Sequence, residues 1–412
     1  MVLCSPSPAS EEPRARRHAL ALANCAEGLK VHFIDCQPRG VSFPDPPEFV
    51  KFGLGRSTYS YATLKSAPMR RLGTRLVEML SRGLFVAFHR PTSPAVSQRG
   101  WGLARILRET SADFVAAYNI DAFLPCAEWS RRRGKPLVLD CQEFYADMGD
   151  SQSTLNRSIA DAVQRATIPR ANLVLATTQC LAGEIVRRYG DVETLVVYNA
   201  PPLEDLVSEP RVPWCSLYWR NYTVDFGQRG LDDILVALAQ LPPFVRLCIQ
   251  GRATPSSQER IRSRCRELGV QGRVELAPSY RPNEAVAVAA RHHIGLCPEQ
   301  PSNLNQRLTA SNKIFDFMMA GLPVVASDVD GLREVVESSG GGLLYSAGQP
   351  DALANVVREL CSSQETHARL AEAARQFAVR EGNLEVQMGR LTKRVLATTR
   401  RPETGKEARH QT

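Results

Sequence analysis

The sequence lacks an apolar run of the roughly 20 residues that a bilayer-spanning helix needs, and it does not open on a basic segment followed by an apolar one. It also lacks Cys-x-x-Cys pairs, although it contains 11 cysteines. Scattered cysteines without close spacing argue against a disulfide framework and against a cysteine-based zinc site. We therefore expect a cytoplasmic protein whose thiols are reduced core residues.

Three further absences narrow the range of partners. The loop after the first predicted strand lacks the Gly-x-Gly-x-x-Gly fingerprint, so we place no dinucleotide there. Basic residues are dispersed rather than gathered in a stripe with interleaved aromatics, which argues against nucleic acid. The pair His292 and His293 lacks a carboxylate or cysteine that would complete a metal site, so we expect no metal. A net charge of +8 favours anionic partners, namely nucleotides, phosphates, anionic lipid or nucleic acid, and does not itself choose among them.

The chain does contain two series of alternating strands and helices. This alternation predicts an α/β fold with two Rossmann-like, doubly wound domains that face a ligand-binding cleft. The predicted strands are 1–4, 31–34, 114–118, 136–140, 173–176 and 195–198 in the first half, and 216–219, 245–249, 274–276, 294–297, 324–326 and 343–345 in the second. A proline-rich linker separates the halves. The predicted parts are a domain over 1–203, a domain over 204–383, a helix over 384–398 that returns to the first domain, and a disordered tail over 399–412.

The stretch 309–327 combines a predicted helix with a predicted buried strand. Its apolar residues at helical spacing should face inward; they are Ile314, Phe315, Met318 and Met319. Ser311 or Asn312 can cap the helix through a side-chain oxygen. Asn312, Lys313 and Asp316 share the other face. That face is either an anion site with an attached hydroxyl-binding group or an ordinary solvated surface, and the local pattern does not choose between them.

A basic amphipathic segment covers 64–88. Its apolar side is formed by Leu72, Leu76, Val77, Met79 and Leu80. Arg70, Arg71, Arg75 and Arg82 make the rest of it basic. Two interpretations remain open: an interfacial helix that lies on anionic lipid, or a domain helix whose arginines face water.

Polar residues follow two predicted strands of the first half. Asn119 and Asp121 follow 114–118, and Gln142 and Glu143 follow 136–140. Ligands of open α/β sheets bind beyond the carboxyl ends of the strands, so Asn119, Asp121 and Glu143 are candidates for a cleft or acceptor site. Loop residues are often polar without such a role.

Seven blocks in the second half occur in a characteristic order and spacing. They are Arg229-Gly-Leu-Asp-Asp-Ile-Leu, Leu247-Cys-Ile-Gln-Gly, Arg273-Val-Glu-Leu, Ile294-Gly-Leu-Cys-Pro, Asn312-Lys-Ile-Phe-Asp-Phe-Met-Met-Ala-Gly, Gly331-Leu-Arg-Glu and Gly341-Gly-Leu-Leu-Tyr. Together they resemble a family 4 glycosyltransferase of GT-B fold. Pro13-Arg-Ala-Arg-Arg-His-Ala and Asp140-Cys-Gln-Glu-Phe-Tyr resemble loops of the same family.

The resemblance implies that a sugar is transferred with retention from a nucleotide-sugar, which binds the second domain, to an acceptor in the first. Arg229 matches the family's basic residue for the donor diphosphate, and Lys313 lies where a subgroup places a lysine near the phosphates; both are the catalytic candidates. The donor-binding candidates are Arg220, Gly251, Asn312 and Asp316. Asp316 stands where the family has the second glutamate of its Glu-x7-Glu pair, which is expected to contact ribose. No cofactor or metal is expected beyond the nucleotide-sugar.

Three departures from the family pattern bear on activity. Aspartate replaces glutamate at Asp316, and the first glutamate of the pair falls at Leu308, with Glu299 nearby but out of register. The first-domain histidine of the family falls at Asn119, which does not titrate near neutral pH. The expected function is polysaccharide or glycoconjugate synthesis on a glycan or lipid-linked acceptor, with peripheral membrane contact through 70–88. The alternatives are a nucleotide-sugar-binding protein of impaired activity and a sugar-nucleotide epimerase.

Overall fold

The computed structural model describes residues 1–9, 12–25, 29–38, 45–61, 68–149, 152–205, 215–226 and 229–400. The chain divides into two compact units. The first consists of Met1–Thr177, Leu181–Val197 and the chain from Met388 onward, and the second of Thr178–Cys180 and Tyr198–Gln387. Residues 206–214 of the predicted linker and 401–412 of the predicted tail lie outside the described residues.

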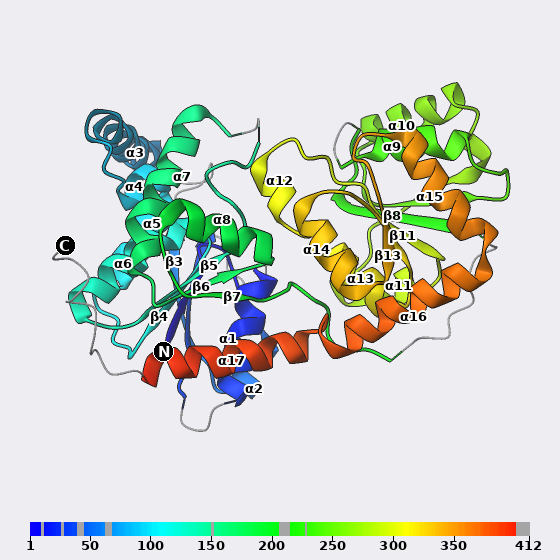
Figure 1. The fold of residues 1–412 in the computed structure, drawn as a ribbon. Coiled ribbons are helices and arrows are strands. Elements are labelled where there is room, and N and C mark those ends of the chain that lie inside the picture. Colours follow the sequence, from blue (N-terminus) through cyan, green and yellow to red (C-terminus); the bar gives the residue numbers. More distant parts are fainter. Residues whose placement is uncertain are drawn as a thin grey trace. The chain divides into compact units, whose positions relative to one another are not determined.

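The first unit is built on a parallel sheet with the strand order β3-β2-β1-β4-β5-β6-β7 (Figure 1). Its strands are β1 (Val2–Cys4), β2 (His32–Pro38), β3 (Gly55–Tyr61), β4 (Val115–Tyr118), β5 (Leu137–Cys141), β6 (Leu173–Ala176) and β7 (Thr194–Val196). Its helices are α1 (Pro13–Cys25), α2 (Pro47–Lys51), α3 (Pro68–Phe88), α4 (Ser93–Val96), α5 (Gln98–Ile106), α6 (Ile120–Arg133), α7 (Thr154–Thr167) and most of α8 (Gln179–Tyr189).

The second unit has its own parallel sheet, with the order β10-β9-β8-β11-β12-β13. Its strands are β8 (Ser216–Thr223), β9 (Arg246–Arg252), β10 (Val274–Ala277), β11 (Ile294–Cys297), β12 (Val324–Ser327) and β13 (Gly342–Tyr345). Its helices are α9 (Leu231–Ala239), α10 (Pro255–Glu267), α11 (Ala285–Ala289), α12 (Leu304–Leu308), α13 (Lys313–Met319), α14 (Asp330–Ser339), α15 (Pro350–Ser362) and α16 (Gln364–Arg380). Helix α17 (Leu384–Arg400) begins here, and its residues from Met388 group with the first unit.

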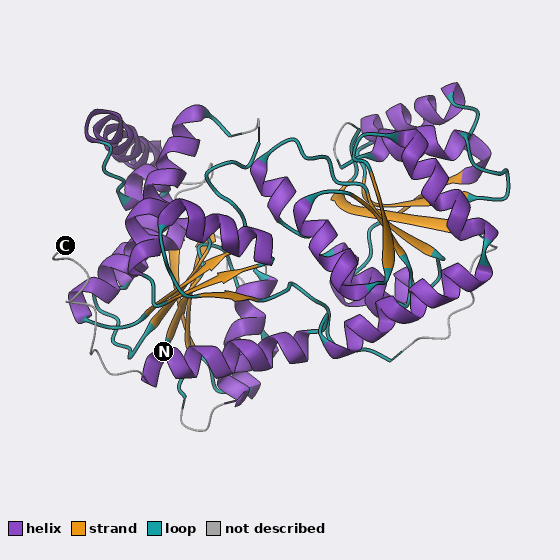
Figure 2. Ribbon diagram, viewed as in Figure 1, coloured by secondary structure: helices purple, strands orange, loops and turns teal. Residues whose placement is uncertain are grey.

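Helices cover both faces of each sheet (Figure 2). For this reason the central strands are apolar on both sides rather than alternating, as their sequences predict. In the second unit, one core joins Leu217, Trp219 and Leu247 of the sheet to helices α9, α10 and α15. On the opposite face, the Phe317 ring of α13 packs edge-on against Tyr218 of β8. The predicted α/β class with two doubly wound domains is confirmed.

The stretch 309–327 forms the predicted helix and strand, namely α13 and β12. The four apolar residues that were predicted to face inward are all buried. The predicted side-chain cap is wrong for Asn312, because this residue has a helical backbone (φ −52°, ψ −32°) and its side chain makes no capping hydrogen bond. Of the two interpretations of the face with Asn312, Lys313 and Asp316, the solvated surface does not fit Lys313, because Lys313 is buried.

Two general features follow from the described residues. No helix among them is both long enough and apolar enough to cross a bilayer. Ten of the 11 cysteines have described side chains; all ten are free thiols, and all but Cys180 are buried. The prediction that cysteines serve as core residues is therefore confirmed for the nine buried positions.

Candidate functional site

The second sheet reverses its strand order between β8 and β11, which are neighbours although they are distant in sequence. At such a switch point the connections leave in opposite directions, and the carboxyl ends of the two strands face a space where ligands bind in doubly wound folds. Arg220 lies near the carboxyl end of β8, and Glu299 follows β11 by two residues. Residues that bind the donor should therefore lie near the carboxyl ends of β8 and β11.

Lys313 and Arg229 meet at a carboxylate. The Nζ atom of Lys313 is 2.9 Å from Oε1 of Glu299, and Nη1 of Arg229 is 3.5 Å from the same oxygen. The Lys313 and Glu299 side chains are only 5% and 6% exposed. Among the described residues, the other oxygen of Glu299 accepts no hydrogen bond. The structure thus brings the two predicted phosphate-binding cations together, and the residue that links them is a glutamate that the family pattern left out of register.

The backbone around Arg229 explains how it reaches this position. Arg229 and Gly230 both have left-handed backbones, with φ of 53° and 69°. A side chain at Gly230 would collide with the carbonyl of Pro298, so glycine permits the close approach of this turn to the segment after β11. That approach places Arg229 beside Glu299. A left-handed conformation at a residue other than glycine costs about 1–3 kcal/mol and is concentrated at functional sites.

Arg220 and Asp316 form a second ion pair. Arg220 also donates a hydrogen bond to the Tyr280 hydroxyl, and its guanidinium lies 5.8 Å from the centre of the Phe317 ring. Lys313, three residues before Asp316, lies 5.7 Å from the centre of the Trp219 ring, next to Arg220 in β8. The two ion pairs therefore adjoin each other. Asp316 is oriented by Arg220, and its carboxylate keeps lone pairs that can accept from a hydroxyl.

The other donor-binding candidates are separate from these ion pairs. Gly251 has φ of 148°, and a side chain there would collide with the carbonyl of Asn221 in the neighbouring strand β8, so packing alone accounts for this glycine. Asn312 is exposed. Leu308 is buried, and its carbonyl accepts a hydrogen bond from the Thr178 hydroxyl. An apolar side chain therefore occupies the position where the family has its first glutamate.

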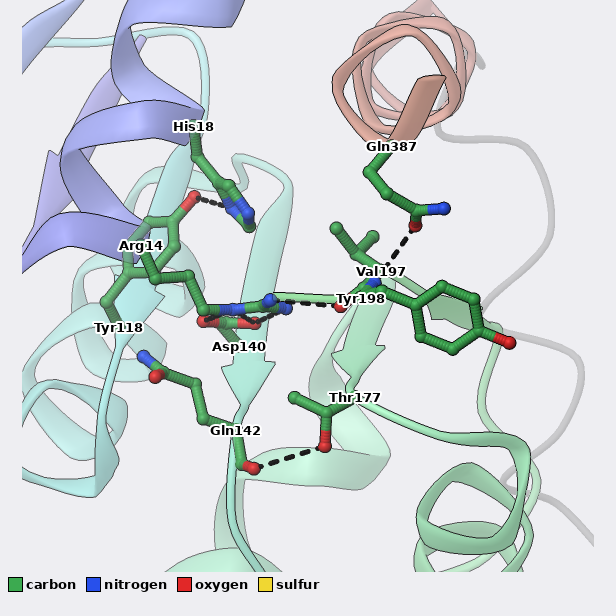
Figure 3. A network of polar contacts seen from close by, with 9 residues as sticks. All are labelled: Arg14, His18, Tyr118, Asp140, Gln142, Thr177, Val197, Tyr198 and Gln387. Atoms are coloured by element: carbon green, nitrogen blue, oxygen red, sulfur yellow. Dashed lines mark hydrogen bonds and ion pairs between the residues drawn. The ribbon is translucent and has the colours of Figure 1, made fainter. Parts of the chain in front are cut away.

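A buried ion pair occupies the first unit (Figure 3). The Arg14 guanidinium, in the first turn of α1, donates three hydrogen bonds of 2.9–3.2 Å to both carboxylate oxygens of Asp140 in β5. Its Nη1 donates to the Val197 carbonyl at 2.9 Å. Burial alone lowers the pKa of Arg14, but the Asp140 carboxylate raises it overall. The segments that begin at Pro13 and Asp140 both resemble loops of the family, but the sequence did not predict that they meet here.

His18 lies beside this pair, one turn after Arg14. Its Nδ1 is 2.9 Å from the hydroxyl of Tyr118, the last residue of β4. Burial and the nearby Arg14 hold the pKa of His18 well below its usual value, so the ring is neutral at pH 7. Glu12 was also not predicted; burial raises its pKa, and it forms a side-chain hydrogen bond with Gln142. The Pro13 and Asp140 motifs were the available signals for these residues.

The three first-unit candidates lie beyond β4 and β5. Asn119 has φ of 70° and ψ of 151°, and its Oδ1 accepts from the Ile120 amide at 2.7 Å. Its side chain is thus fixed to the start of α6. Burial raises the pKa of Asp121, with a Ser97 hydrogen bond opposing the shift. Glu143 is partly exposed just after β5. Since the first sheet reverses its order between β1 and β4, these positions adjoin that switch point.

The histidine pair has structural contacts. The His292 ring stacks on Tyr218 at 4.4 Å with an interplanar angle of 4°, and its Nδ1 is 2.8 Å from Oγ of Ser216. The Ser216 amide donates to Nδ1 of His293 at 3.3 Å. Burial lowers the pKa of His292 to about 4. Within the described ranges, no group of three or more His, Cys, Asp or Glu residues is arranged to hold a metal ion.

Two family models match the chain in succession. The "Glycosyl transferase 4-like domain" matches residues 13–200, and "Glycosyl transferases group 1" matches residues 221–363. The chain belongs to the family 4 glycosyltransferases. The two matches meet near the boundary of the two units, and the second contains Arg229, Glu299, Lys313 and Asp316.

Individual relatives of this glycosyltransferase chain are more distant. It is 32% identical over 185 residues to a D-inositol 3-phosphate glycosyltransferase of Xylanimonas cellulosilytica, covering 42% of this chain and 41% of that protein. It is 24% identical over 260 residues to a GDP-mannose:cellobiosyl-diphosphopolyprenol alpha-mannosyltransferase of Xanthomonas campestris, covering 61% and 65%. The matches thus span less than two thirds of the length of either relative.

A solved structure supports the fold of this glycosyltransferase. HepE of Anabaena, in complex with UDP, has a TM-score of 0.67 and 16% identity, covering 96% of this chain and 99% of HepE. At this identity the likeness concerns the fold. The predicted GT-B fold is confirmed.

Proposed function

We propose that this glycosyltransferase moves a sugar from a nucleotide-sugar donor to a glycan or lipid-linked acceptor, with retention, in polysaccharide or glycoconjugate biosynthesis. The donor binds the second unit, and its diphosphate is held by Arg229 and Lys313. The observation that carries the proposal is the gathering of Arg229, Lys313 and Arg220 at the switch point of the second sheet. These cations come from three separate segments, and two of them share one buried carboxylate oxygen.

The chemistry of the leaving group fits these cations. A nucleoside diphosphate gains negative charge as its bond to the sugar breaks. Fixed positive groups in a site of low water content stabilise such a developing anion without reorganising. Asp316, held by Arg220, is placed one turn of α13 from Lys313 and serves the ribose hydroxyls in this proposal. In the unliganded protein Glu299 neutralises Lys313, so donor binding exchanges one anion for another.

The retaining stereochemistry in this proposal comes from the resemblance to the family. The acceptor hydroxyl attacks from the face that the diphosphate leaves, and the departing phosphate oxygen takes the acceptor proton. No carboxylate nucleophile is invoked, since Asp316 and Glu299 are each engaged with cations. The relative from Xanthomonas, whose name includes a diphosphopolyprenol acceptor, supports a lipid-linked acceptor. Free buried thiols support a cytoplasmic location.

Two single variants test the proposal. Arg229→Ala and Lys313→Ala should each lower turnover by at least roughly tenfold, because a hydrogen bond to a charged group contributes about 1.5–3 kcal/mol. Arg246→Ala is the matched control: Arg246 is exposed at the amino end of β9, and its loss removes the same charge. Turnover is measured as nucleoside diphosphate release over a panel of donors and acceptors. Activity like that of the unsubstituted protein in both site variants would sink the phosphate assignment.

A nucleotide-sugar-binding protein without turnover is the second candidate. Two observations favour it: Leu308 is buried where the family has a carboxylate, and the Asn119 side chain is fixed to its own helix. The two candidates differ in a single measurement. Stabilisation by a nucleotide-sugar that is never consumed, with any acceptor of the panel, supports the second; consumption supports the transferase.

A further inference from the structure

Helix α3 presents its apolar side outward. It lies at the outside of the first unit and packs against α4 (Figure 1). Seven large apolar side chains of this helix are between 49% and 71% exposed: Leu72, Leu76, Met79, Leu80, Leu84, Val86 and Phe88. They make up half of the large hydrophobic side chains that are exposed in the described part of the chain. Exposure on this scale is unusual for a helix of a folded domain.

The side of α3 that faces the protein is the polar one. Phe85 is buried there, and Arg82 is half-buried there; Arg82 pairs with Glu78 at 3.3 Å and donates a hydrogen bond to Asn156 of α7. At 100° per residue the exposed apolar positions cover about 200° of the helix surface, and Arg75 borders them. Glu78 is the one acidic residue of the helix sequence, which contains four arginines. The exposed face is therefore apolar with a basic edge and no acidic residue.

We propose that α3 docks the protein on an anionic membrane surface, with its apolar side among the lipid chains and its basic edge, which includes Arg75, among the headgroups. The helix has too many arginines to cross the bilayer, and no described helix qualifies as a membrane span. A helix of this composition lies in the plane of the interface. The inference goes beyond glycosyl transfer, because it rests on α3 alone and not on the donor site.

Charge selects the membrane over a second copy of the chain. Two α3 helices paired through their apolar faces would bring their arginines together, and neither helix has a free acidic residue to meet them. Anionic lipid supplies the missing negative charge, and each basic residue near such a surface contributes about fivefold in binding. Replacing Arg70, Arg71 and Arg75 by glutamine should therefore weaken membrane binding by roughly 100-fold.

Liposome flotation of the full-length protein tests the proposal. The unsubstituted protein should float with vesicles of phosphatidylcholine and phosphatidylglycerol, but not with phosphatidylcholine alone, and added salt should reverse the binding. The triple variant Leu76→Ser, Leu80→Ser, Leu84→Ser should stay unbound. Phe244→Ser, which removes an exposed aromatic side chain from the second unit, should float like the unsubstituted protein.

Three results would overturn it: no flotation with anionic vesicles, equal flotation of the triple serine variant, or equal flotation of the triple glutamine variant. Sedimentation velocity without lipid tests whether two copies of the chain associate through this face of α3. A dimer that dissociates in the serine variant assigns the face to self-association and also overturns the proposal. All three replaced leucines are exposed, so the serine variant should keep the Tm of the parent protein. The salt dependence of binding is measured on the parent protein and therefore does not depend on whether a variant folds.

Discussion

Replacing Glu299 by glutamine tests the assignment of the donor site more directly than removing a cation. A diphosphate that binds Lys313 and Arg229 must displace the carboxylate oxygen that lies 2.9 Å from one and 3.5 Å from the other. Glutamine has nearly the same shape and keeps an oxygen that can accept a hydrogen bond from Lys313, but it carries no charge. The substitution therefore removes the competing anion without emptying the position.

The geometry sets the expected magnitude. At 2.9 Å and an effective dielectric constant of about 20, the attraction of the Lys313–Glu299 pair is about 6 kcal/mol before desolvation is subtracted. Removing one partner of a buried pair costs about 3–5 kcal/mol net, and the amide oxygen recovers about 1 kcal/mol. We expect the unliganded variant to be about 2–4 kcal/mol less stable. For a unit of this size that loss lowers the Tm by roughly 4–16 °C.

A bound nucleotide should restore the stability that Glu299→Gln loses. Such a restoration distinguishes a binding site from a structural ion pair. Thermal unfolding of the full chain is followed with and without UDP or GDP. A bound diphosphate supplies the charge that the variant lacks, so the nucleotide should raise the Tm of the variant more than that of the parent protein. If about 1.5–3 kcal/mol of competition is removed, the nucleotide binds the variant roughly 10- to 150-fold more tightly.

The matched control is Glu359→Gln, which removes an exposed carboxylate from α15 of the same unit. It should leave both the Tm and nucleotide binding unchanged. If UDP and GDP stabilise Glu299→Gln no more than the parent protein, Glu299 is a structural counter-ion and the competition argument is refuted. If neither nucleotide stabilises any of the three proteins, the assignment of this site to a UDP or GDP donor is refuted.

Two other perturbations concern stability. The pKa of His292 is lowered to about 4, so between pH 6.5 and 4 the unfolded chain binds a proton that the folded chain does not. The free energy of unfolding should therefore fall by up to about 3 kcal/mol as the pH drops through this range, and by less in His292→Phe. Urea unfolding at a series of pH values measures both changes. An equal loss in both proteins would contradict this assignment. Asp140→Ala leaves the buried Arg14 without its partner and should lower the free energy of unfolding by about 3–5 kcal/mol. The double variant Arg14→Met, Asp140→Leu should lose less stability. A larger loss in the double variant, measured by calorimetry, would contradict this expectation.

Sequence patterns predicted most of the strands because a buried parallel strand is a short apolar run between polar loops. Every predicted strand of the second half has a counterpart within a few residues. Strand β3 was not predicted. It reads Gly-Arg-Ser-Thr-Tyr-Ser-Tyr, lies at the edge of the first sheet and pairs with β2 alone. An edge strand buries less apolar surface, so its sequence lacks the signal on which the prediction depends.

The site was predicted less completely than the fold. Arg229 and Lys313 could be identified from family blocks, but their link through Glu299 depends on the contact of Gly230 with Pro298, which is tertiary. The same applies to Arg220 and Asp316, which are 96 residues apart. Helical spacing placed Lys313 and Asp316 on one face, yet it could not show that Lys313 is buried. Burial of a cation depends on the partner that neutralises it, and local sequence does not name that partner.

The two ion-pair sites of this chain differ in whether their buried polar atoms make hydrogen bonds. In the first unit, three nitrogens of Arg14 and both oxygens of Asp140 take part in hydrogen bonds. In the second unit, Nε of Arg220 and Oε2 of Glu299 are buried and make no hydrogen bond to another described residue, while Nζ of Lys313 contacts Oε1 of Glu299 at 2.9 Å. Buried polar atoms cost free energy unless they are paired, so a purely structural cluster should engage them. The unpaired atoms of the second unit are the ones that a diphosphate and a sugar hydroxyl can satisfy. Asp140→Ala should therefore lower the Tm in a way that nucleotide does not restore, whereas the deficit of Glu299→Gln is restored.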